Sequence, residues 1–116
     1  RAILNVLKDQ NRKISVVVYK IEINNPVEKA RLKKMIAFMN LNKLFLSSPF
    51  NPEIKSHQIE ENSNELQLKI ALQFEGSEEI LKSRLKDFSR SLSFILSVID
   101  PNIKFSRELI FFGENA

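Results

Sequence analysis

KARLKKM at residues 29–35 and KSRLKDF at residues 82–88 are two versions of one heptapeptide, and they decide the fold. Each copy lies just inside a segment whose apolar residues recur at helical spacing, and each of those segments follows an alternating strand pattern. The chain therefore consists of two strand–cap–helix units joined into one domain. The repeat indicates an architecture, and it identifies no substrate or partner.

The first unit is a strand at residues 14–23 followed by a helix that runs to about Asn40. Asn25 is a good N-cap, Pro26 suits the first helical position, and Glu28 completes a capping box. These start signals predict a helix beginning directly after the first strand.

The middle of the chain predicts a hairpin. Residues 53–61 form a weakly amphipathic strand that follows Pro49 and Pro52, and prolines suit an edge strand because they cannot donate to a central ladder. A polar turn at residues 61–64 leads into the regularly alternating strand 65–75, which has one face on a core and the other near water.

The second helix begins after the cap residue Ser77 and ends at Asp100, and the last strand covers residues 103–112. A short helix is expected in front of the domain, at Ala2–Gln10. Right-handed crossovers place both long helices on one face of a four-stranded antiparallel sheet. This is an α+β, ferredoxin-like βαββαβ two-layer sandwich.

The length of 116 residues suits one domain, which we place at residues 13–113. Residues 1–12 form an N-terminal helix or linker stub, and residues 114–116 form a tail. The chain begins at Arg1, so we expect a fragment or a processed form. The absence of cysteine excludes disulfides and thiolate metal sites, and a formal charge of +4 falls short of a dedicated nucleic-acid binder.

No residue pattern indicates catalysis, a metal or a cofactor. The single histidine, His57, has Glu60 and Glu61 nearby, but one strand does not gather a metal's ligands alone. Glu78 and Glu79 are explained by the positive end of the helix dipole. With two glycines the chain cannot form a glycine-rich phosphate loop. We therefore expect no enzyme, no cofactor and no small-molecule substrate.

Two functions known for ferredoxin-like folds lack their sites in this sequence. An RNA-recognition sheet needs stacking aromatic residues on the solvent faces of the central strands, and none lies in that phase here. An acylphosphatase-like site needs a glycine-containing phosphate loop beside the first strand, where only Arg12 is present.

The two helices carry basic residues that recur with the heptapeptide. Two such faces could bind nucleic acid or an anionic surface, although a solvated helix face is the usual explanation and nucleic acid is the less expected partner. The candidate basic surface comprises Lys29, Arg31, Lys33, Lys34, Lys82, Arg84 and Lys86.

The last strand is apolar in both phases. An edge strand of this kind invites pairing or burial, either with a partner or under the N-terminal helix. Phe105, Leu109 and Phe111 lie in one phase, and Ile110 and Phe112 lie in the other. We predict these five residues as a protein–protein interface.

From Lys29 onward the pattern resembles the soluble domains of PilO-like and GspM-like inner-membrane assembly proteins of type IV pili and type II secretion systems. The resemblance rests on ELQLKIALQFEGS at residues 65–77, an alternating strand that ends in a small residue and leads into a helix with a Leu/Phe stripe. In those families a strand comparable to residues 102–112 follows.

The resemblance implies a non-enzymatic scaffold or oligomerisation module that forms a homodimer or heterodimer. It implies a periplasmic location, with a cytoplasmic one left open, and Ala2–Gln10 would be the stub of a coiled coil rising from a membrane anchor outside this sequence. It carries over no catalytic residue.

Overall fold

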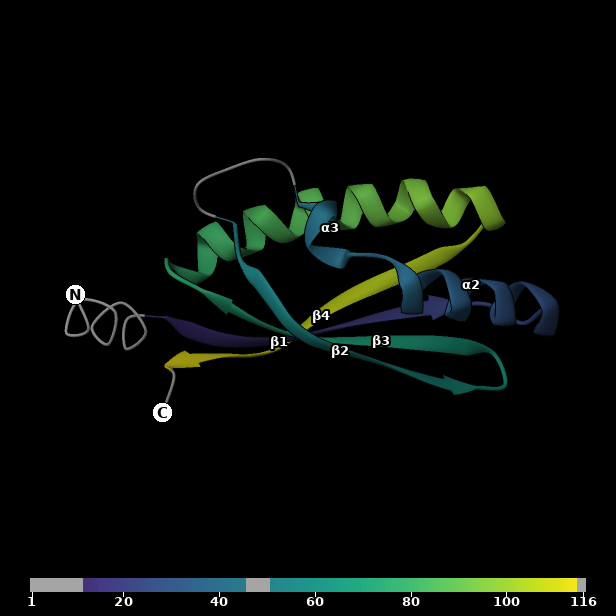
Figure 1. Cartoon of the computed structure of the whole chain (residues 1–116), viewed down its shortest axis with the longest axis horizontal. Helices are drawn as coiled ribbons and strands as arrows, with labels where there is room; N and C mark the ends of the chain where they lie inside the picture. The colour runs from purple at the N-terminus through teal and green to yellow at the C-terminus, as the bar shows by residue number, and fades with distance from the viewer. Residues whose placement is uncertain (1–11, 46–50, 115–116) are drawn as a thin grey trace.

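The computed structural model of the chain describes residues 12–45 and 51–114 (Figure 1). Its elements, in order, are β1 (Lys13–Glu22), α2 (Pro26–Phe38), the short 3-10 helix η1 (Leu41–Leu44), β2 (Glu53–Asn62), β3 (Glu65–Phe74), α3 (Glu78–Ile99) and β4 (Lys104–Glu114). The expected helix at Ala2–Gln10 lies outside the described residues.

The four strands form one sheet in the order β2-β3-β1-β4, and every neighbouring pair is antiparallel. Helices α2 and α3 lie together on one side of this sheet (Figure 1). The ferredoxin-like βαββαβ arrangement predicted from the sequence is therefore confirmed. Among the described residues, no helix combines the length and apolar character that a bilayer crossing requires.

Both predicted helix starts are capped by the expected side chains. The side-chain oxygen of Asn25 accepts hydrogen bonds from the backbone N–H groups of Val27 at 2.9 Å and Glu28 at 3.1 Å. Ser77 Oγ accepts one from the N–H of Ile80 at 3.2 Å. Each bond satisfies a donor that the first turn of a helix leaves without a partner.

The core lies between the sheet and the two helices. Leu32 and Leu85, the equivalent leucines of the two heptapeptides, are buried, and each contributes roughly 1.5–3 kcal/mol by leaving water. The rings of Tyr19 and Phe88 lie 5.6 Å apart, and Phe45 after η1 lies 5.0 Å from Phe88. The heptapeptide is thus a core element of both helices.

Strand β4 contains a bulge that the alternating pattern did not predict. Val17 lies opposite Leu109, but the next residue, Val16, lies opposite Phe111, so Ile110 is the extra residue. Beyond the bulge, odd-numbered and even-numbered residues exchange the faces of the sheet on which they lie.

The interpretation that put Phe111 in the phase of Phe105 and Leu109, with Phe112 in the other, is therefore wrong. Phe112 lies opposite the buried Ser15 on the helix side of the sheet, whereas Phe111 lies on the uncovered side.

Gly76 and Gly113 each lie next to a phenylalanine ring, but the ring at Gly76 is buried and the ring at Gly113 is half-exposed. A Cβ at Gly76 would lie 2.8 Å from Cε2 of the buried Phe74, and Gly76 has a φ of +152°. A Cβ at Gly113 would lie 2.6 Å from Cζ of Phe111, a ring that is 49% exposed, and Gly113 has no positive φ.

The Gly76→Ala substitution should therefore lower the free energy of unfolding by about 1–3 kcal/mol, because alanine is strained at positive φ and Phe74 is confined in the core. Gly113→Ala is the matched control and should lower the free energy of unfolding clearly less, because the Phe111 ring has solvent to move into. Urea denaturation of both variants measures the difference, and equal losses would contradict this account.

Candidate functional site

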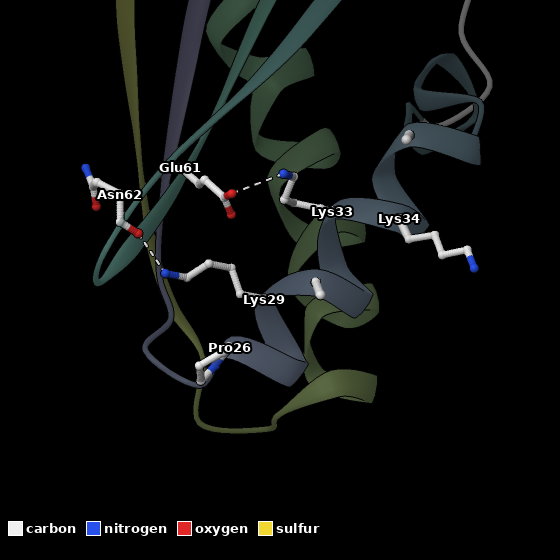
Figure 2. Close-up of a pocket in the computed structure, with 8 residues that line it drawn as sticks. Pro26, Lys29, Lys33, Lys34, Glu61 and Asn62 are labelled. Atoms are coloured by element: carbon white, nitrogen blue, oxygen red, sulfur yellow. Dashed lines mark hydrogen bonds and ion pairs between the residues drawn. The ribbon is translucent and has the colours of Figure 1, made fainter.

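The predicted basic surface begins with Lys29, which the structure buries. The residue is only 8% exposed, and Nζ donates to the backbone carbonyl of Asn62 at 2.6 Å (Figure 2). It also donates to the carbonyl of Ser63 at 2.9 Å. The expectation that Lys29 points outward is wrong. The ammonium group instead joins the first turn of α2 to the β2–β3 hairpin.

Ion pairs within the chain occupy several of the other basic side chains. Lys33 Nζ lies 3.2 Å from Glu61 Oε1, Lys82 Nζ lies 3.2 Å from Glu78 Oε2, and Arg84 lies 3.7 Å from Asp87. Within residues 12–45 and 51–114, Lys29 bonds only to carbonyl groups, and the other members of the set without an ion pair are Arg31, Lys34 and Lys86.

A groove separates α2 from the end of β2 that leads into the hairpin. In Figure 2, Lys34 points away from the Lys33–Glu61 pair, so the lysines do not converge on one point. Glu61 also brings a negative charge into the groove. The groove is lined by Pro26, Lys29, Ala30, Lys33, Lys34, Ala37, Glu61 and Asn62.

The described part of the chain contains no group of three or more histidine, aspartate and glutamate side chains that could hold a metal ion. His57 lies on β2 opposite the buried Ile70, on the helix side of the sheet, and is half-buried. His57 is thus a paired residue of the β2–β3 ladder, with its side chain partly covered.

The five predicted interface residues divide into two groups. Phe105, Leu109 and Phe112 pack against the core; the Phe105 ring lies 5.8 Å from the Tyr19 ring, and Lys13 Nζ lies 5.2 Å from the centre of the Phe112 ring. These three side chains therefore contribute to the packing of the core.

Ile110 and Phe111 lie on the face of the sheet that the helices leave uncovered. They are 54% and 49% exposed. Ile110 keeps the phase of Ser106 and Glu108, and the bulge turns only Phe111 away from the core. Ile110 borders a shallow groove with Val16 and Val18 of β1, and the rest of its lining is polar: Lys20, Gln67, Lys69 and Glu108. The result is a small apolar patch with a polar rim.

Alternation alone could not assign these residues to a face, because residues 109–112 are an unbroken apolar run. The signal that could have indicated a bulge is Gly113 directly after the run, since a glycine in a strand often marks such a site.

Beneath β4 lies a polar contact within the core. The hydroxyl of the buried Tyr19 and Ser89 Oγ of α3 lie 2.7 Å apart, and Arg107 is opposite Tyr19 in the sheet. Burial raises the pKa of Tyr19 to about 12, against smaller lowering effects of the Ser89 hydrogen bond and the Arg107 charge.

The sequence matches no protein family model and no curated protein. Among solved structures, a de novo designed protein with ferredoxin fold aligns with a TM-score of 0.53 at 19% identity, over 84% of this chain and 85% of that one. The aminobenzoyl-glutamate utilization protein from Klebsiella pneumoniae aligns with a TM-score of 0.56 at 12% identity, over 92% of this chain. This chain spans about 30% of that protein. At these identities the similarity shows the fold alone.

Replacing Lys29 with methionine should lower the free energy of unfolding by about 1–3 kcal/mol, because the carbonyl groups of Asn62 and Ser63 lose the charged donor that ties the hairpin to α2. The same change at Lys34, an exposed lysine of the same helix, should stay within about 0.5 kcal/mol. Chemical denaturation of both variants provides the comparison. Equal effects would show that Lys29 does not anchor the hairpin.

Tyr19 is the chain's only tyrosine, so tyrosinate absorbance reports its ionisation directly. We expect a midpoint near 12 in the folded protein, against about 10 in the unfolded chain. Since the folded pKa is the higher one, the associated stability is complete below pH 10 and is lost as pH rises through 12; it amounts to about 2–3 kcal/mol. Tyr19→Phe should remove this part of the pH dependence. A midpoint near 10 while the protein is still folded would refute the assignment.

Proposed function

We propose that this chain is a non-enzymatic assembly module that associates with a second copy of itself through the β4 side of its sheet. The observation that carries the proposal is the exposure of Ile110 and Phe111 beside a bulge on the uncovered face. Removing apolar side chains at such a position from water by contact with a partner lowers the free energy.

The composition of the patch supports protein contact. Specific interfaces have an apolar centre and a polar rim, and here Val16, Val18 and Ile110 border one groove with Lys20 and Glu108.

The position of the Phe111 ring supports the proposal further. The ring lies over Gly113, close enough to collide with an added Cβ. The ring therefore rests over the strand on one side and leaves about half of its surface for a partner to cover.

We propose further that the assembly is of the membrane-associated kind found in pili or secretion systems, with the module on the periplasmic side. This part rests on the resemblance of residues 65–77 to the PilO-like and GspM-like domains. The alternative of nucleic-acid or anionic-surface binding has less support. Lys29 is buried, and Lys33, Lys82 and Arg84 are paired within the chain.

Sedimentation velocity over a concentration series tests the proposal. The unmodified chain should form dimers, and Phe111→Glu or Ile110→Glu should weaken dimerisation at least about tenfold, because each places a charge in the apolar part of the contact. Phe38→Glu makes the same chemical change on α2, at a ring that is 83% exposed, and should leave dimerisation unchanged. A chain that remains monomeric at every concentration, or equal effects of Phe38→Glu and Phe111→Glu, would refute self-association through β4.

A further inference from the structure

We propose that two copies of this chain pair β4 to β4 in an antiparallel register centred on Ser106. Lys104 of each copy then lies opposite Glu108 of the other. The inference rests on the proposed self-association and gives it a geometry: one continuous eight-stranded sheet with all four long helices on the same side.

The available pairing segment is the first half of β4. One edge of β4 pairs with β1, and no strand in the described part of the chain pairs with its other edge. The bulge at Ile110 interrupts the regular ladder, so the straight segment is Lys104–Leu109. An unpaired edge of this kind presents free backbone N–H and C=O groups that a second strand can satisfy.

The pleat restricts the register. Two identical edges pair antiparallel about a two-fold axis perpendicular to the sheet, and residues opposite each other then point to the same face. Because side chains alternate, the axis must pass through a residue rather than between two residues. Each residue of the segment is therefore one candidate centre.

Charge selects among these centres. An axis through Lys104, Arg107 or Glu108 would place two like charges directly opposite each other, which destabilises a strand pair. An axis through Phe105 would leave Lys104 opposite Ser106, without a charged partner. An axis through Leu109 would extend the pairing across the bulge, where the regular ladder is interrupted. An axis through Ser106 places Lys104 opposite Glu108 twice, all on the uncovered face, where these three side chains are exposed.

The same register gives Arg107 a partner on the helix side. Nη1 of Arg107 is buried and has no hydrogen-bond partner among the described residues. Phe105 of the second copy would lie opposite it, and a guanidinium group stacks favourably on an aromatic ring. Pairing would therefore place an aromatic surface next to the least satisfied polar group of β4.

The paired segment also ends next to the apolar patch formed by Ile110 and Phe111. Ile110 directly follows the straight segment in each copy, so the patch borders each end of the paired segment. Edge pairing and contact through the patch thus form one continuous surface.

The other edge of the sheet suits this role less well. Strand β2 presents the exposed charges of Glu53, Lys55, Glu60 and Glu61, and it has a bulge between Ile54 and Ser56. Charged side chains and bulges are the means by which edge strands avoid pairing.

Charge reversal tests the register by sedimentation velocity. Lys104→Glu and Glu108→Lys should each weaken homodimerisation roughly tenfold or more, because each homodimer then has two like-charge pairs. Mixing the two variants should restore dimers as a heterodimer, since both cross-strand pairs are then opposite in charge. No effect confined to one chain can be rescued by mixing.

Lys20→Glu is the matched control, because Lys20 Nζ lies 3.7 Å from Glu108 Oε2 of its own chain. It should weaken dimerisation much less than Lys104→Glu does. Thermal unfolding of each variant establishes that it is folded.

The outcomes separate the two proposals. If the unmodified chain dimerises and Phe111→Glu prevents it, but the mixed charge variants stay monomeric, the register is wrong and self-association stands. If reversal at Lys104 and Glu108 has no effect, the register is likewise wrong. A strictly monomeric unmodified chain refutes both proposals.

Discussion

The period of two in strand β1 is the constraint on which the rest of the structure depends. β1 is paired on both edges, so its register with β3 and β4 sets the face of every residue opposite it. Val17, Tyr19 and Ile21 are fully buried beneath the helices, and a slip of one residue would expose all three. The cost of that exposure holds the sheet in one register, and the positions of α2 and α3 follow from it.

The bulge in β4 is a local departure from this constraint, and it produces the one feature that suggests association. Before the bulge, Leu109 faces the core, and beyond it Phe112 does the same. The extra residue allows two core contacts at a spacing that regular alternation forbids, and Phe111 turns outward beside Ile110 in consequence. Gly113 accommodates the Phe111 ring on that outer face.

The sequence was sufficient for the fold because its signals are local and agree with one another. The caps Asn25 and Ser77, the alternation of residues 65–75 and the helical stripe through Leu85 each indicate the observed element. The candidate site was harder to predict from the sequence, because it depends on contacts between distant segments. The acceptors of Lys29 are carbonyls more than 30 residues away, and helical spacing carries no information about them.

The distribution of charge decides what kind of assembly the sheet can form. The helix faces lose much of their positive charge to partners in the same chain, as in the Lys33–Glu61 and Lys82–Glu78 pairs, which leaves no concentrated field for a polyanion. On its uncovered face, strand β4 carries Lys104 and Glu108 on either side of Ser106, and this order of charges is self-complementary. In the dimer that we propose, pairing β4 with β4 would use the open edge of both copies and leave β2 at each end. Because β2 is charged and bulged, strand addition would stop at two copies, which is the difference between a closed dimer and a filament.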